Sequence, residues 1–156
     1  MINKKQLIIN LYYEIMKNKI FIACDHAGYE LKEGILEHYK DTISDLGTNN
    51  IESVDYPEYA FKLVEKVKSN KLSYGILICG SGIGMTIAAN RHKDIRAGLA
   101  FNPEIAKQMR LHNNANVLVL PGRFIDVQSA LKCVEIFLET SFEAGRHQRR
   151  IDKLSI

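Results

Sequence analysis

The chain has 156 residues, of which 46% are hydrophobic and 25% charged. This composition is typical of one globular domain and excludes an intrinsically disordered chain. The formal net charge of +3 is too small to indicate a polyanionic partner such as nucleic acid, but it is compatible with a small anionic substrate.

The first residues resemble a secretory signal only superficially. Lys4 and Lys5 precede the apolar run 7–13, but Glu14 follows that run and no small-residue cleavage site is present. The run is also far shorter than the ~20 apolar residues that a membrane span needs. We therefore expect no membrane partner, and we interpret residues 1–15 as an N-terminal extension or a misassigned start before a single domain, residues 16–156.

From Lys19 onward, short apolar runs alternate with longer stretches of helical period. The runs predict five strands, at Ile20–Cys24, Thr42–Leu46, Tyr74–Cys79, Ile95–Phe101 and Val117–Leu120. The periodic stretches predict a helix that begins near Pro57 and others at Tyr29–Tyr39, Ile83–Asn90, Pro103–His112, Val127–Glu139 and Phe142–Leu154.

The strand runs are continuously apolar rather than alternating, which indicates a parallel sheet covered on both faces. We predict an α/β fold, a three-layer αβα Rossmann-like sandwich with a central, mainly parallel five-stranded sheet. Ligands in such folds bind beyond the carboxyl ends of the strands. The candidate site segments are therefore Cys24–His26, Cys79–Gly84, Phe101–Asn102 and Pro121–Arg123.

The three cysteines, Cys24, Cys79 and Cys133, are odd in number and contain no CxxC pair. This pattern favours free thiols in a reducing compartment, so we expect a cytoplasmic protein. Cys24 and Cys133 fit buried structural roles. Cys79 ends the most apolar strand, and a cysteine beside a helix N-terminus ionises more readily and can act as a nucleophile or general base.

The turn Cys79–Gly84 has glycines at positions 80, 82 and 84 between a strand and a helix. Such a turn can direct backbone N–H groups at a phosphate or at an oxyanion that develops during catalysis. A tight strand–helix connection is the alternative interpretation. The turn is neither a dinucleotide fingerprint, since Met85 stands where a small residue is needed, nor a P-loop, since no Lys follows.

Two further features carry chemistry. Asp25 and His26 follow the first strand and could move hydroxyl protons, although a helix-capping Asp beside a surface His is the alternative. Arg146 and Arg150 are four residues apart, so on a helix they share a face and can bind one anion, whereas a solvated basic tail is the alternative. We expect no metal site, because Cys24 and His26 lack further ligands at a recognised spacing.

Taken together, several segments resemble the type B ribose-5-phosphate isomerases, within a wider family that includes galactose-6-phosphate isomerase subunits. The resemblance runs from about Lys19 to the end of the chain. Its matching stretches are Ile22–Gly28, Asp55–Pro57, Ile76–Gly84, Ala88–Asn90, Ile95–Ala97, His112–Leu118 and Gly145–Arg150.

This resemblance implies reversible interconversion of ribose 5-phosphate and ribulose 5-phosphate without a metal or organic cofactor. It implies that Cys79 is the base that moves a proton between C1 and C2 through an enediolate. It further implies that His112 is the acid that opens the furanose ring, assisted by Asp25. The enediolate cradle would be Gly80, Ser81, Gly82, Ile83 and Gly84.

The remaining contacts implied by the resemblance are with the substrate. Asp25, His26, Tyr56 and Asn113 would line the sugar site, and Arg123, Arg146 and Arg150 would bind phosphate or substrate. The resemblance also implies a homodimer or homotetramer with shared active sites. A hexose-phosphate isomerase acting on galactose 6-phosphate or allose 6-phosphate remains an alternative, and a non-catalytic phosphate-binding module of flavodoxin type is an alternative of another class.

Overall fold

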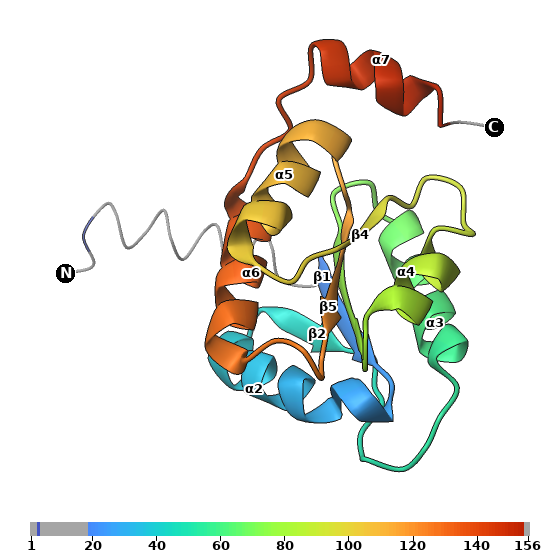
Figure 1. Ribbon diagram of the computed structural model, residues 1–156, viewed down its shortest axis with the longest axis vertical. Coiled ribbons are helices and arrows are strands. Elements are labelled where there is room, and N and C mark those ends of the chain that lie inside the picture. Colours follow the sequence, from blue (N-terminus) through green and yellow to red (C-terminus); the bar gives the residue numbers. More distant parts are fainter. Residues whose placement is uncertain (1–2, 4–18, 155–156) are drawn as a thin grey trace.

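The computed structural model describes Asn3 and residues 19–154. The segment expected to be an extension, residues 1–15, and the alternative start at Met16 lie outside the described residues, apart from Asn3. The described chain forms a five-stranded sheet between two layers of helices (Figure 1), as the sequence predicted.

Every described strand pairing is parallel. The strands β1 (Ile20–Cys24), β2 (Ile43–Asp45), β3 (Tyr74–Cys79), β4 (Ala97–Leu99) and β5 (Val117–Pro121) lie in the order β2-β1-β3-β5-β4. Two of the three inner strands, β3 and β5, are almost wholly buried, which explains why their sequences, YGILIC and VLVLP, are continuously apolar.

The helices cover the two faces of the sheet unequally. Helices α2 (Tyr29–Tyr39), α5 (Pro103–Asn113) and α6 (Val127–Glu139) lie on one face, and α3 (Tyr56–Lys68) and α4 (Ile83–Ala89) on the other (Figure 1). Successive residues of a strand point to opposite faces. Ile76 and Ile78 of β3 accordingly join the core under α2, α5 and α6, while Leu77 and Cys79 join the core under α3 and α4.

Local sequence signals explain where several helices begin. Asn102 accepts a hydrogen bond from the backbone N–H of Ile105, and Asp126 accepts one from that of Ser129, each at 2.9 Å. These side chains occupy the N-cap positions of α5 and α6, where they satisfy backbone donors that would otherwise lack partners. Proline occupies the first turn of both α3 and α5.

Several predicted elements are shorter in the structure, and two of them markedly so. The expected strand 95–101 is reduced to β4 (Ala97–Leu99), because Ile95 instead closes a turn on the carbonyl of His92. The expected final helix begins only at Arg146, as α7 (Arg146–Asp152). Ala144 and Gly145 adopt φ of 60° and 54°, which no right-handed helix accommodates.

Helix α7 belongs to neither layer and lies beyond the end of α5 (Figure 1). Among residues 3 and 19–154, no helix combines the length and apolarity required to cross a membrane.

Candidate active site

In the strand order β2-β1-β3-β5-β4, β2 lies on one side of β1 and β3 lies on the other. The connections after β1 and after β3 therefore run in opposite directions across the sheet, and a crevice lies between the ends of these two strands. Cys24 is opposite Ile78, and the backbone N–H of Asp25 donates to the Ile78 carbonyl at 3.1 Å. Asp25 and Cys79 therefore flank the crevice in which folds of this topology bind ligands.

Cys79 is the last residue of β3 and is 5% exposed. Its carbonyl oxygen accepts a 2.8 Å hydrogen bond from the N–H of Gly122, which fixes the end of the strand. The other two cysteines have different surroundings. Burial raises the pKa of Cys24 to about 12 and that of Cys133 to about 11, so neither supplies a thiolate near neutral pH.

The turn after Cys79 requires glycine at two positions. Gly82 has φ of 76°, and a Cβ there would lie 2.3 Å from Leu99 Cδ1. A Cβ on Gly84 would lie 2.8 Å from the Tyr56 ring, so the ring packs directly on the turn. The backbone N–H groups of Ser81 and Gly82 donate to no other described residue, which leaves them available to a ligand.

Two predicted side chains lie against this turn, and a third, His26, follows the neighbouring strand β1. Tyr56, at the start of α3, covers Gly84. Arg123 lies beside Gly80, since a Cβ on Gly80 would be 3.4 Å from its Nη1. His26 accepts a 3.3 Å hydrogen bond at Nδ1 from the N–H of Val54, which leaves the proton of the neutral ring on Nε2.

Asp25 makes the local contacts that the capping interpretation predicts. Its Oδ1 accepts hydrogen bonds from the N–H groups of Ala27 at 2.9 Å and Gly28 at 3.1 Å, at the start of the short helix η1 (His26–Gly28). Among the described residues only Oδ1 is used in this way, so Oδ2 is available for other partners. The carboxylate is thus held in a fixed position at the mouth of the crevice.

The other predicted site residues do not join this group. His112 and Asn113 are in the last turn of α5, and Arg146 and Arg150 are on α7. Strand β5 begins shortly after His112, and just before it the carbonyl of Asn116 accepts a 2.9 Å hydrogen bond from the N–H of Gly75. Gly75 is near the start of β3 and Cys79 is at its end.

The four residue steps from Gly75 to Cys79 correspond to about 13 Å along the strand. The structure thus divides the predicted site residues between the two edges of one sheet. Asp25, His26, Tyr56, Arg123 and the turn Cys79–Gly84 are at the carboxyl edge. His112, Asn113, Arg146 and Arg150 are at the amino edge.

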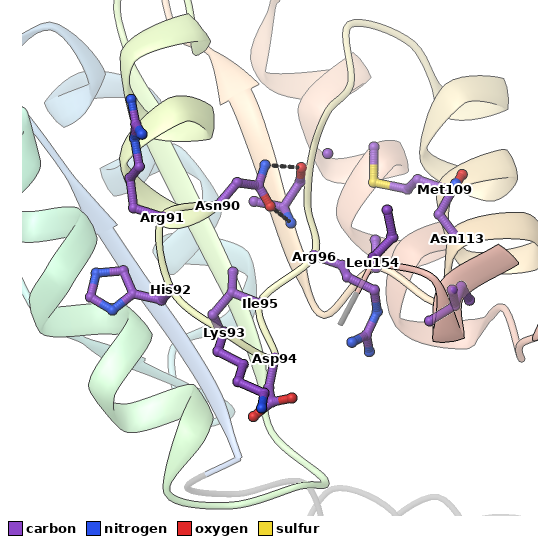
Figure 2. Close-up of a pocket in the computed structure, with 14 residues that line it drawn as sticks. Asn90, Arg91, His92, Lys93, Asp94, Ile95, Arg96, Met109, Asn113 and Leu154 are labelled. Carbon is purple, nitrogen blue, oxygen red and sulfur yellow. Dashed lines mark hydrogen bonds between the residues drawn. The ribbon is translucent and has the colours of Figure 1, made fainter. Parts of the chain in front are cut away.

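A cavity of about 620 Å³ lies at the amino edge, and Figure 2 shows the side chains around it. It is bounded by the loop 90–96, by the outer strand β4 and by Asn113 and Leu154. The Asn90 amide holds the loop against β4 by exchanging two 2.9 Å hydrogen bonds with the backbone of Ala97. Of the predicted site residues only Asn113 lines this cavity, so it is separate from the crevice at Cys79.

Sequence reasoning did not single out two side chains that contact His112. Glu143 Oε2 lies 3.7 Å from His112 Nε2, and the His147 ring stacks on the His112 ring with centroids 4.3 Å apart. His147 could have been noticed because it lies between Arg146 and Arg150 in the basic segment. Nothing in the sequence, however, linked Glu143 or His147 to His112. The potential metal-ligating atoms of His112, Glu143 and His147 all lie within 4.8 Å of one another.

The geometry of these three side chains does not favour a metal ion. The two imidazole planes are only 16° apart, so their lone pairs, which lie in the ring planes, point side by side rather than at one point. In addition, Arg150 Nη1 lies 3.4 Å from His147 Nδ1 and adds positive charge.

The fold and the crevice together define an α/β sandwich with a thiol and a glycine turn at its topological switch point. Residues 20–154 match the family model described as Ribose/Galactose Isomerase, and the chain belongs to that family.

Named relatives support this assignment. The chain is 46% identical to the probable ribose-5-phosphate isomerase B of Mycoplasma genitalium, over 89% of this chain and 95% of that protein. It is 38% identical to the ribose-5-phosphate isomerase B of Escherichia coli, over 88% of this chain and 94% of that protein.

Solved structures agree in fold. The ribose 5-phosphate isomerase of Thermotoga maritima superposes with a TM-score of 0.84 at 51% identity, covering 87% of this chain and 96% of that one. The ribose-5-phosphate isomerase B of Mycoplasma genitalium with bound ribulose-5-phosphate gives a TM-score of 0.83 at 47% identity, covering 86% and 92%.

Proposed function

We propose that this protein interconverts ribose 5-phosphate and ribulose 5-phosphate, with Cys79 as the base. The observation that carries the proposal is the pairing of a buried thiol at the end of β3 with the unengaged N–H groups of Ser81 and Gly82 in the adjoining turn. The relative with bound ribulose-5-phosphate supports the choice of substrate.

The reaction requires one base and a place for negative charge. The Cys79 thiolate removes the proton from C2 of the open-chain aldose, and the electron pair of that bond forms an enediolate with charge on O1. Backbone N–H donors stabilise an oxyanion of this kind. The proton on O2 then moves to O1, so that the negative charge passes to O2. The thiol returns its proton to C1 while C2 becomes the ketone, which gives the ketose and restores the thiolate.

Ring opening and phosphate binding need groups at the opposite edge of the sheet, and we propose that a second copy of the chain supplies them. In this arrangement His112 of one copy protonates the ring oxygen of a sugar held at Cys79 of the other, while Asp25 accepts the anomeric hydroxyl proton. Arg146 and Arg150 extend the same edge as a basic face suited to a phosphate dianion.

Exposed apolar side chains support a homodimer. Ile83 and Ile87 lie one turn apart on α4, immediately after the glycine turn, and are 56% and 54% exposed. Phe101, after β4, is 59% exposed. Apolar groups at this density beside a binding crevice are typical of an interface.

The test is formation of ribulose 5-phosphate from ribose 5-phosphate by the purified protein, beside Cys79→Ala and the control Cys133→Ala. We expect turnover by the parent and the control and near-complete loss in Cys79→Ala. Galactose 6-phosphate and allose 6-phosphate are assayed in parallel. A parent that turns over none of the three substrates would refute the proposal and favour a non-catalytic phosphate-binding module.

A further inference from the structure

A cluster of three side chains lies at the end of α5: His112 of that helix, Glu143 of the loop before α7, and His147 of α7. The His112 and His147 rings stack at 4.3 Å, and Glu143 Oε2 lies 3.7 Å from Nε2 of the first ring and 4.0 Å from Nε2 of the second. Glu143 Oε2 therefore faces the Nε2 atom of each of the two rings.

The backbone holds Glu143 in this place. Its N–H donates a 3.1 Å hydrogen bond to the carbonyl of Leu111, the residue before His112. The next two residues, Ala144 and Gly145, have positive φ and turn the chain back so that α7 begins beside α5. A left-handed conformation costs a residue other than glycine about 1–2 kcal/mol, so contacts such as these must maintain the turn at Ala144.

His147 does not compete strongly for the carboxylate. It is 5% exposed, and its Nε2 has no hydrogen-bond partner among the described residues. Burial lowers the pKa of His147 below its ordinary value, and repulsion by His112 and Arg146 lowers it further, so the ring is neutral near pH 7. Glu143 is thus left to pair with His112, whose side chain is more exposed.

We propose that Glu143 is a positioning residue whose carboxylate, 3.7 Å from Nε2 of His112, attracts Nε2–H electrostatically and thereby turns Nδ1 of that ring toward the sugar. The proposal rests on the proposed function, because it concerns the ring-opening step. No hydrogen bond to His112 Nδ1 is present within residues 19–154, so this nitrogen is free to face a substrate.

The C1–O4 bond of the furanose breaks and its electron pair goes to O4, which takes the proton from Nδ1 of the His112 imidazolium. The anomeric hydroxyl loses its proton to Asp25 of the other copy, and C1 becomes an aldehyde. His112 is left neutral with its remaining proton on Nε2, the nitrogen that faces the Glu143 carboxylate.

The test separates ring opening from carbon chemistry. Ribulose 5-phosphate cannot close to a furanose, because its C5 oxygen carries the phosphate. Deuterium uptake at its C1 in D2O therefore reports on the Cys79 step alone. We expect Glu143→Gln to slow consumption of ribose 5-phosphate by roughly tenfold or more, while C1 exchange changes less than about twofold.

Two variants complete the design. Glu143→Asp, which keeps the carboxylate, should retain more ribose 5-phosphate turnover than Glu143→Gln, and Glu139→Gln, an exposed glutamate at the end of α6, should match the parent. An equal loss of turnover and C1 exchange in Glu143→Gln would overturn the proposal, as would no change in either.

A second readout needs no activity. Nitrogen-15 NMR of the His112 ring reports which nitrogen is protonated in the neutral form. We expect the proton on Nε2 in the parent and a larger Nδ1–H population in Glu143→Gln. A parent ring protonated mainly on Nδ1 would overturn the proposal even if the protein proved inactive on every sugar phosphate, an outcome that would count separately against the proposed function.

Discussion

The backbone N–H of Gly75 donates a 2.9 Å hydrogen bond to the carbonyl oxygen of Asn116. This contact fixes the beginning of β5 beside the beginning of β3, and therefore fixes His112, four residues earlier, at the amino edge of the sheet. Cys79 is at the carboxyl edge of the same strand. No change of side-chain rotamer brings the two residues together across about 13 Å of strand.

Complementation between variants is the first prediction. Cys79→Ala and His112→Asn should each be nearly inactive alone, whereas co-expression should restore about a quarter of the parent activity, because half of the dimers are mixed and each has one intact site. The measurement is ribose 5-phosphate turnover by the co-purified mixture. No recovery from variants that still associate would indicate that each chain uses its own His112.

The three cysteines should differ in reactivity. Cys24 and Cys133 are fully buried and burial raises the pKa of both, so alkylation by iodoacetamide at pH 8 should modify Cys79 first and abolish turnover. Peptide mass spectrometry identifies the modified residue, and ribose 5-phosphate should protect it. Equal labelling of Cys133 at early times would contradict this assignment.

Gly84 should tolerate no side chain while Tyr56 is present. In Gly84→Ala the new Cβ would lie 2.8 Å from the Tyr56 ring, which must then move away from the turn and out of the sugar site proposed above. We expect the Michaelis constant for ribose 5-phosphate to rise about tenfold, which is roughly the loss of affinity expected when one well-placed substrate contact is removed. In a Tyr56→Ala background the same substitution should have a much smaller effect, and an undiminished effect would place its cause outside this contact.

Stability should fall on mild acidification because of His147. Its pKa is lowered in the folded chain, mainly by burial and then by His112, Arg146 and Arg150, against the opposing effect of Glu143. Below about pH 6.5 the unfolded chain binds a proton that the folded chain resists, so the free energy of unfolding declines as the pH falls toward 5.5.

Urea unfolding at pH 7.5 and 5.5 measures this decline. His147→Gln, which cannot titrate, should show a smaller difference between the two pH values than the parent, whereas His38→Gln, at an exposed position on α2, should match the parent. A pH dependence unaltered by His147→Gln would exclude His147 as its source.

Much of the fold could be predicted because its signals are local. The strands Ile20–Cys24 and Tyr74–Cys79 and the helices Tyr29–Tyr39 and Val127–Glu139 have the bounds that the apolar pattern predicted. The expected helix over 142–154 was wrong at its start, because residues 144 and 145 adopt positive φ to bring α7 back to α5. The local sequence does not predict a positive φ at Ala144, because contacts between distant segments impose that conformation.

The candidate site divides in the same way. Asp25, Cys79 and the glycine turn could be found from the sequence, since they follow apolar strands and the carboxyl ends of parallel strands share one edge. The strand order β2-β1-β3-β5-β4, the location of His112 at the opposite edge and the approach of Glu143 to its ring were decided only by tertiary structure. These relationships join segments about 20 or more residues apart, or reverse the chain through strained backbone. They depend on which surfaces pack together rather than on any local preference.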